Sequence, residues 1–372
     1  MKSEIFRLKF VCASLLSLAA AAAQAQFTAG NLAVFQVGNG SSALTSAGTA
    51  VFLDQYTVAG SFVNSVSIPS TGASALVTSG SANSEGALSL SANGRYLVFA
   101  GYNTAAGTAS VASSTSATVP RGVATVDASG NYNLAATTST ALSANNIRSA
   151  TSDGSGNFWA AGANGGTIYY NSGTTAITNQ STSVNNRVIQ DIGGNLYFST
   201  GSGSTRGIYV INGAPTTTGN TAVNIINASS LGSVSPYDFA FNANLTLAYI
   251  ADSDAYTTSA GFGGIEKWAF NGTAWVFQYS LPTVGVGADG LAVDFSGANP
   301  VIYATSADGT SLFDVVDTGS SSTANSLASA GANEAFRGLD FAPQGVPEPS
   351  TFALAGIGLA ALCQSRRLRR KA

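Results

Sequence analysis

The sequence predicts an all-β protein, a β-propeller of six four-stranded blades, and three observations support this fold class. A self-similar unit of short apolar strands and turns containing glycine or asparagine recurs about every 40 to 60 residues, the repeat length of propeller blades. Only 9% of the residues are charged, yet 19 Phe and 13 Tyr can fill a large core, which a disordered chain lacks. The repeat also ends on a single strand that three N-terminal strands can complete.

Five complete units can be followed along the chain. Each begins with an apolar strand, passes a short turn and enters a second strand rich in Tyr, Phe and Val. These paired strands are predicted at residues 85–90 and 95–100, 148–153 and 157–160, 187–191 and 195–198, 237–241 and 245–250, and 289–294 and 301–304. Third strands at 207–210 and 264–268 and fourth strands at 222–226 and 273–281 continue two of the units. Four antiparallel strands per unit is the pattern of a propeller blade.

A sixth unit opens at residues 337–341 and has no further strand before the C-terminal segment. The N-terminal region supplies candidates at 31–37, 51–58 and 62–68. Pairing the last strand with these three closes the ring and removes two exposed sheet edges, so we expect the last blade to be shared between the two ends of the chain.

Residues 101–145 are the least regular part of the repeat. We assign them to the outer strands of the first blade, with 123–126 as its third strand. An irregular seventh blade is an alternative for this segment. The content of Gly, Ser, Thr and Asn also allows an open β-solenoid in place of a propeller.

The repeat resembles the six-bladed NHL, YVTN and lactonase-like propellers. The resemblance is one of architecture, spread over about 310 residues, and its motifs are degenerate. It implies a central channel lined by the first strand of every blade. Lactonase-like propellers hold a catalytic calcium in that channel with Glu, Asn and Asp ligands.

Composition excludes several kinds of chemistry. The chain contains no histidine, which removes histidine triads, histidine zinc sites and histidine general bases. Its two cysteines, Cys12 and Cys363, lie in the terminal segments, so the body between them forms no disulfide and has no thiolate. From Gln26 to Pro343 there are 16 acidic and seven basic residues, a net charge of −9, which argues against a nucleic-acid partner or an anionic membrane surface.

Residues 1–25 are predicted to be a signal peptide. Lys2, Arg7 and Lys9 form a positive region, residues 10–23 are apolar, and small residues flank Gln24. Cleavage by signal peptidase is expected between Ala25 and Gln26, which would place the mature body outside the inner membrane.

The C-terminal segment has three parts in order. Val346, Pro347, Glu348 and Pro349 precede an apolar stretch at 351–363, and five basic residues follow between positions 366 and 371. This arrangement resembles the PEP-CTERM sorting signal of Gram-negative bacteria. The resemblance implies a short transmembrane stretch, removal of the tail by an exosortase, and delivery to the cell surface or to extracellular polymer in a biofilm. The expected domains are therefore 1–25, 26–343 and 344–372.

Six charged residues fall at one position of the repeat, at the start of the first strands: Glu85, Arg148, Arg187, Asp238, Asp289 and Arg337. We expect them to meet at one mouth of the channel. They would form a pocket for carboxylate, sulfate, phosphate or sugar hydroxyl groups, or they would pair with one another and seal the channel.

No cofactor is expected, although Glu85, Asp238 and Asp289 leave Ca²⁺ as a candidate beside the arginines. Asp252-Ser253-Asp254 resembles part of a calcium loop but lacks the glycine and distal glutamate, so we predict a turn rich in aspartate there.

The sequence is compatible with three functions. The first is a non-enzymatic propeller at the cell surface or in the matrix that binds exopolysaccharide or surface proteins. The second is a calcium-dependent lactonase or another hydrolase that uses the channel carboxylates. The third is a structural matrix protein without a specific ligand.

Overall fold

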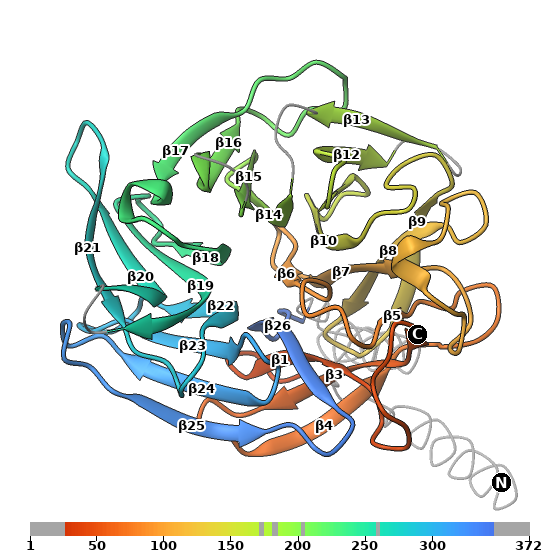
Figure 1. Ribbon diagram of the computed structural model, residues 1–372, viewed down its shortest axis with the longest axis horizontal. Coiled ribbons are helices and arrows are strands. Elements are labelled where there is room, and N and C mark those ends of the chain that lie inside the picture. Colours follow the sequence, from red (N-terminus) through yellow and green to blue (C-terminus); the bar gives the residue numbers. More distant parts are fainter. Residues whose placement is uncertain (1–26, 171–174, 181–184, 202–204, 258–260, 346–372) are drawn as a thin grey trace, which may run out of the picture.

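The computed structural model of the chain describes residues 27–345, apart from 171–174, 181–184, 202–204 and 258–260. The sequence-predicted signal peptide, its cleavage site at Ala25 and Gln26, and the motif at 346–349 lie outside the described residues. Six antiparallel four-stranded sheets stand around a central axis, as Figure 1 shows. The protein is therefore all-β, and the predicted six-bladed propeller is confirmed.

Five blades follow one another along the chain, each with its first strand innermost and its fourth outermost (Figure 1). Blade one contains β6 (Leu88–Leu90), β7 (Tyr96–Tyr102), β8 (Arg121–Asp127) and β9 (Tyr132–Thr138). Blade two contains β10 (Ile147–Ser152), β11 (Phe158–Gly162), β12 (Thr167–Tyr170) and β13 (Ala176–Gln180). Blade three contains β14 (Asn186–Ile192), β15 (Asn195–Thr200), β16 (Gly207–Ile211) and β17 (Val223–Asn227). Blade four contains β18 (Pro236–Phe241), β19 (Leu247–Thr257), β20 (Phe262–Phe270) and β21 (Trp275–Leu281). Blade five contains β22 (Ala288–Asp294), β23 (Val301–Ser306), β24 (Ser311–Val316) and β25 (Ala324–Ser329).

Blade six joins the two ends of the described chain. Its innermost strand is β26 (Ala335–Phe341), followed outward by β1 (Leu32–Val37), β3 (Val51–Tyr56) and β4 (Phe62–Ser67). The register sets Leu32 opposite Phe341 and Val34 opposite Leu339. Strand β1 from the N-terminal end is therefore paired with strand β26 from the C-terminal end. The predicted closure is confirmed, because the strands from the two ends of the chain pair with each other in one blade.

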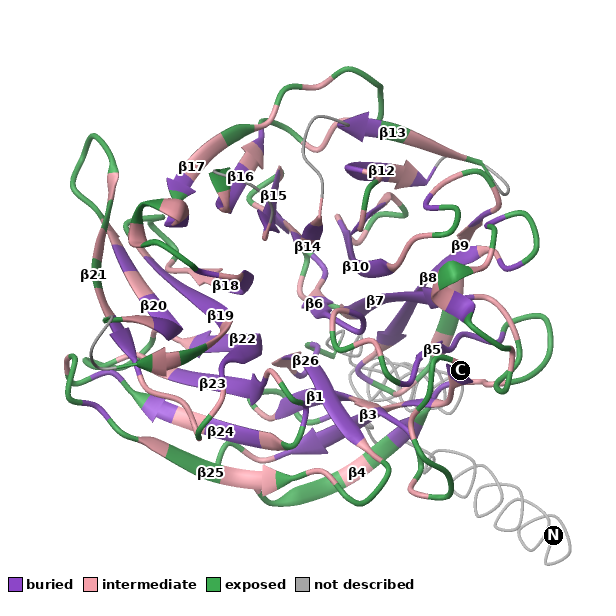
Figure 2. Cartoon of the chain, viewed as in Figure 1, coloured by how far each residue is buried: buried purple, intermediate pink, exposed green. Residues whose placement is uncertain are grey.

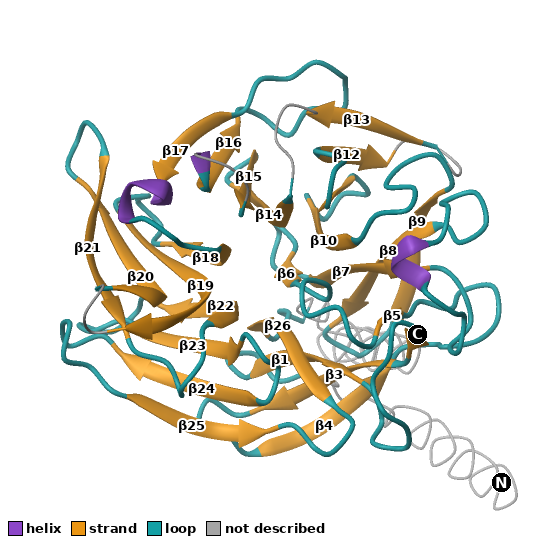
Figure 3. Cartoon of the chain, viewed as in Figure 1, coloured by secondary structure: helices purple, strands orange, loops and turns teal. Residues whose placement is uncertain are grey.

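Residues 101–145 complete blade one and do not form a further blade. They supply the end of β7, a 3-10 turn at Val111–Ser113 (η1), and strands β8 and β9. A short pairing of β2 (Gly48–Thr49) with β5 (Thr78–Ser79) lies beside them. Figure 3 shows how little helix there is, in short turns such as η1 and the 3-10 turn η3 (Ala228–Leu231).

The core lies between the faces of neighbouring blades, and burial decreases from the axis outward (Figure 2). All six residues of the inner strand β10 are buried, whereas the outermost strand β25 is exposed or half-buried throughout. Strands next to the axis are packed on both faces, so polar residues such as Ser149 and Thr151 of β10 are buried together with Ile147.

The turn predicted at Asp252-Ser253-Asp254 is wrong, because these residues continue strand β19. Asp252 lies opposite Gly264 of β20 and is fully buried. Its carboxylate accepts hydrogen bonds from the backbone N–H of Ser235 and of Asp254, both at 2.8 Å. Asp252 therefore accepts backbone hydrogen bonds as an aspartate in a turn would, but it does so inside an extended strand.

Both ends of the described chain leave the propeller beside blade one. The backbone N–H of Phe27 donates to Ala128 in the β8–β9 turn (2.9 Å), and that of Gln344 donates to Gly94 in the β6–β7 turn (2.8 Å). These turns are on the face where first strands end. Within residues 27–345, apart from the gaps given above, no helix has the length and apolar character needed to cross a bilayer.

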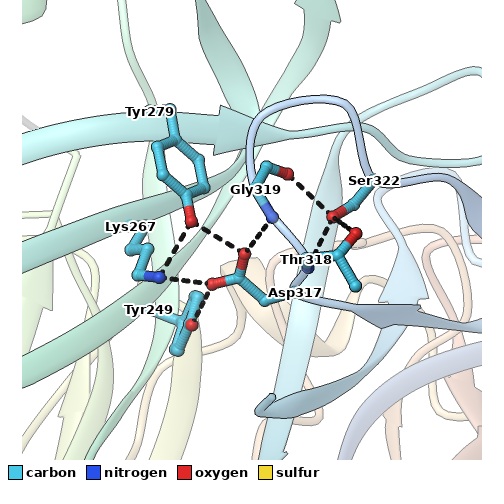
Figure 4. A network of polar contacts seen from close by, with 7 residues as sticks. All are labelled: Tyr249, Lys267, Tyr279, Asp317, Thr318, Gly319 and Ser322. Carbon is cyan, nitrogen blue, oxygen red and sulfur yellow. Dashed lines mark hydrogen bonds and ion pairs between the residues drawn. The ribbon is translucent and has the colours of Figure 1, made fainter. Parts of the chain in front are cut away.

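A polar latch joins blade four to blade five, as Figure 4 shows. Lys267 of β20 forms an ion pair of 2.6 Å with Asp317, just after β24, and Tyr279 of β21 donates to the same carboxylate at 2.8 Å. Tyr249 of β19 donates to it as well. Although burial acts to raise it, the hydrogen bonds from Lys267, Tyr249 and Tyr279 hold the pKa of Asp317 below its usual value. Three strands of one blade thus depend on one carboxylate of the next.

Replacing Asp317 by Asn is expected to lower the free energy of unfolding by about 3 kcal/mol, because Lys267 loses its counter-ion and a buried hydrogen-bond network loses its acceptor. Denaturant unfolding would measure this. The double variant Lys267→Met, Asp317→Asn should cost clearly less than the sum of the two single changes. Additive losses, or a loss below about 1 kcal/mol for Asp317→Asn, would contradict the latch.

Candidate functional site: a charged ring in the propeller channel

A β-bulge occurs at the same place in five of the inner strands. The ladder shifts register between Ile147 and Ser149 of β10, and between Pro236 and Phe239 of β18. Equivalent shifts occur in β14, β22 and β26. The first residues of the bulged segments in these five strands are Arg148, Arg187, Tyr237, Asp289 and Arg337. A bulge releases a residue from the ladder and redirects its side chain, so these five form what we call the bulge ring.

The charges of the other four members of the bulge ring all act on the hydroxyl of Tyr237. The side chain is buried, and this hydroxyl has no hydrogen-bond partner among the described residues. Burial and the charge of Asp289 raise the pKa of Tyr237, while the charges of Arg187, Arg148 and Arg337 act in the opposite direction. The Arg187 guanidinium also lies 5.1 Å from the centre of the Tyr237 ring.

The three arginines of the ring are held by neutral groups. Nη1 of Arg148 donates to the side chain of Asn185 (2.5 Å) and to the carbonyl of Asn186 (3.1 Å). Nη2 of Arg187 donates to the hydroxyl of Ser235 (3.0 Å), and Nη2 of Arg337 donates to the carbonyl of Gly80 (3.1 Å). In each of these arginines the Nε–H is buried and has no partner in the described part of the chain.

None of the six sequence-predicted charges forms an ion pair with another, because Lys267 with Asp317 is the one ion pair found among the described residues. Burial lowers the pKa of Arg148, and the neighbouring charge of Arg187 adds to that effect. The arginines are thus close enough to repel one another without being neutralised at contact distance. This arrangement does not match charges that pair off and seal the channel.

The three predicted carboxylates occupy different places. Asp289 lies in the bulge ring and accepts a hydrogen bond of 2.5 Å from Ser253. Glu85 lies just before β6, and its oxygens accept from Ser79 N–H (2.8 Å), the hydroxyl of Tyr102 (2.6 Å) and the amide of Asn146 (2.6 Å). Its pKa is raised by burial to about 7.

Asp238 lies one residue beyond the bulge ring. Its oxygens accept from Gln190 (3.0 Å), from the backbone N–H of Phe239 (2.8 Å) and from that of Leu291 in the next blade (3.1 Å). Burial raises its pKa well above the usual value. Across the described residues no group of three or more acidic side chains is placed to hold a metal ion, so the three carboxylates are not assembled into a calcium site.

The residue that sequence reasoning missed is Tyr237. Aligning the units on the aspartate selects Asp238, but the ladder makes Pro236-Tyr237-Asp238-Phe239 equivalent to Asn186-Arg187-Val188-Ile189. The signal available in the sequence was the apolar residue two positions after each ring residue: Ala150, Ile189, Phe239, Leu291 and Leu339. In blade one the corresponding position is Gly86, so that blade contributes no side chain to the ring.

Outside the propeller, residues 345–367 match the model of the PEP-CTERM protein-sorting motif. The chain carries a PEP-CTERM sorting tail. It is accordingly an exported protein of the exosortase-sorted class, as the sequence predicted. The PEP-CTERM motif covers the tail alone, so it defines the route of the protein and leaves the activity of its propeller open.

Among solved structures, this PEP-CTERM protein is similar to the periplasmic gluconolactonase of Pseudomonas aeruginosa, at 14% identity over 80% of this chain and 82% of that chain, with a TM-score of 0.46. It is also similar to the β-propeller domain of Cps50 (Swd1) from Myceliophteria thermophila, at 12% identity over 82% and 89% of the two chains, with a TM-score of 0.43. Kuenenia stuttgartiensis hydrazine synthase aligns at 10% identity over 74% and 75%, with a TM-score of 0.42. No curated protein matches the chain in sequence. Similarity at this level does not indicate what the protein binds.

The free energy of unfolding is expected to increase as the pH falls from about 8 to about 5. Burial raises the pKa of Glu85 to about 7, and those of Asp289 and Asp340 to about 6. In the unfolded chain such carboxyls lose their protons near pH 4, so between these values the folded state binds more protons and acid favours it. The pKa of Asp317 is lowered, so its titration lies below this window.

Thermal unfolding followed by circular dichroism between pH 8 and pH 5 would test this expectation. The midpoint should be higher at pH 5, and Asp340→Asn should reduce the slope, because one of the titrating groups is gone. A midpoint that falls steadily on acidification over this range would show that the buried carboxyls are ionised in the folded protein.

Proposed function

We propose that this exported propeller is a non-enzymatic binding protein of the cell surface or extracellular matrix, and that its bulge ring binds an anionic group of an extracellular polymer. The group would be a carboxylate or sulfate, such as that of an acidic polysaccharide. Signal peptidase and an exosortase would act on the two ends of the chain during export.

The observation that carries the proposal is a set of unsatisfied donors around one point. Three guanidiniums each have a buried Nε–H that lacks a partner, and their charges act on the hydroxyl of Tyr237, which also lacks one. Burying cations and donors without partners is costly, and an anion among them would remove much of that cost. Guanidinium groups match the planar oxygens of carboxylates and the oxygens of sulfates.

The charge of the body makes the site selective. The segment from Gln26 to Pro343 has a net charge of −9, so an anionic polymer is repelled by most of the surface. The cluster of Arg148, Arg187 and Arg337 is a local exception. Anionic ligands would therefore be directed to the ring, and binding would weaken as salt screens that attraction.

The depth of the ring limits which part of a polymer can reach it. Arg148 and Arg337 are 9% and 5% exposed. Such a site would accept a small charged substituent or a chain end while the polymer backbone stays outside. We propose binding rather than catalysis because Glu85, Asp238 and Asp289 already accept hydrogen bonds from protein groups.

Isothermal titration of the purified protein with trigalacturonate and with inorganic sulfate would test the proposal. Arg187→Gln should weaken binding at least tenfold, because a charge-assisted hydrogen bond contributes about 1.5–3 kcal/mol. Tyr237→Phe should weaken it by a smaller factor, since one hydroxyl donor is lost. Binding should also fall when the salt concentration is raised from 50 to 300 mM.

Arg95→Gln is the matched control, because Arg95 is exposed in the β6–β7 turn, away from the ring. It should leave the affinity unchanged. If neither anion binds, or if Arg95→Gln weakens binding as much as Arg187→Gln does, the ring is not the site and the attraction is nonspecific.

A further inference from the structure

A cavity lies between blades one and two, on the face opposite the bulge ring. Its volume is about 440 Å³. Blade two contributes the β10–β11 turn and Phe158 at the start of β11. Arg148 of the ring is near the start of β10 and Ser152 of the cavity is at its end, so the two sites are separated by about 13 Å along that strand.

The strand register gathers polar and aromatic side chains on the cavity side of blade one. Tyr96 lies opposite Asp127, and Thr125 lies opposite Asn133 in the next strand outward. Residues two apart on one strand share a face, and so do residues directly opposite each other, so these four line one wall. Phe158, which is half-buried, stands on the other wall.

Several groups in this wall are available for a ligand. The hydroxyl of Tyr96 and the side-chain amide of Asn133 make no hydrogen bond to the described part of the protein, and Asn133 is exposed. The Asp127 carboxylate is held in place, because it accepts from Ser129 N–H, Asn131 N–H and the Asn131 amide, each at 2.9 Å. No lysine or arginine is among the residues that line the cavity.

We propose that this cavity binds an uncharged sugar unit of a polysaccharide. Tyr96 and Phe158 supply aromatic surface for the apolar face of a sugar ring, and the free hydroxyl and amide supply directional hydrogen bonds to its hydroxyls. The carboxylate of Asp127, with no lysine or arginine among the lining residues, disfavours an acidic sugar. The cavity therefore selects against the ligand class proposed for the bulge ring.

A comparison within the molecule supports this choice of site. Another cavity, of about 190 Å³, lies between blades three and four and also contains aromatic residues, among them Trp275. Its lining is mostly apolar, with Asn212 as its one amide. It therefore offers stacking surface with few groups to orient a sugar.

The two sites would give the protein a bridging role. An acidic group would bind at the ring on one face, and a neutral chain would bind on the other. Neither site uses a residue of the other, so the second site does not depend on the function proposed for the ring.

Titration of the purified full chain with cellohexaose and with maltohexaose would test the proposal. At least one of these neutral hexasaccharides should bind, and Asn133→Ala and Tyr96→Ala should each weaken that binding at least fivefold. Asn325→Ala is the matched control, because Asn325 is likewise the exposed second residue of an outermost strand, in blade five, and it should change nothing. Trigalacturonate should not compete for the site.

Failure of both hexasaccharides to bind would overturn the proposal, as would equal weakening by Asn133→Ala and Asn325→Ala. Asn133 is exposed, so its replacement keeps the test valid even if Tyr96→Ala disturbs folding. The Arg187→Gln variant should bind the neutral probe normally, and this separates a failure here from a failure of the ring.

Discussion

Each inner strand of the propeller is a sheet edge, and the hydrogen bonding of these edges governs the rest of the structure. Backbone groups on a buried edge must find partners. Here they find them across the blade boundary: Asp340 accepts from Leu90 N–H (2.6 Å), Asp238 from Leu291 N–H (3.1 Å) and Ser149 from Ile189 N–H (3.1 Å). Two of the scarce carboxylates near the axis therefore join blades, and this explains why a chain with few charges keeps them buried.

The same constraint places the bulge ring. Backbones of neighbouring blades meet so closely that a Cβ on Gly338 would lie 2.3 Å from the Leu88 nitrogen, and one on Gly290 would lie 2.7 Å from the Arg337 carbonyl oxygen. Glycine is required at these points, and the residue before each glycine, Arg337 or Asp289, is the one that the bulge releases from the ladder. The β-bulge thus has two results. It lets neighbouring blades pack closely, and it frees the ring side chains from the regular alternation of the strand.

The architecture could be predicted from the sequence because strands, turns and an unfinished last unit are all properties of local pattern and chain order. Local pattern and chain order were enough to predict that residues 31–37 close the last blade. They were also enough to assign residues 101–145 to blade one. The ring was harder, since a bulge adds one residue without changing composition, and this shift replaced Tyr237 by Asp238 in the sequence alignment. The cavity between blades one and two could not be predicted. Its residues Tyr96, Asn133 and Phe158 belong to strands whose contacts depend on how neighbouring sheets face each other.

The position of the chain ends relates the fold to the export route. The described chain ends beside the β6–β7 turn, where Gln344 donates to Gly94, and the bulge ring lies where the first strands begin, at the opposite face. The segment that carries the PEP-CTERM motif therefore continues from the face with the cavity between blades one and two. A sorting tail attached at that face leaves the mouth with Arg148, Arg187 and Arg337 pointing away from the attachment. On the binding roles proposed above, the ring would lie on the face away from the tail, and the cavity between blades one and two would lie on the same face as the tail.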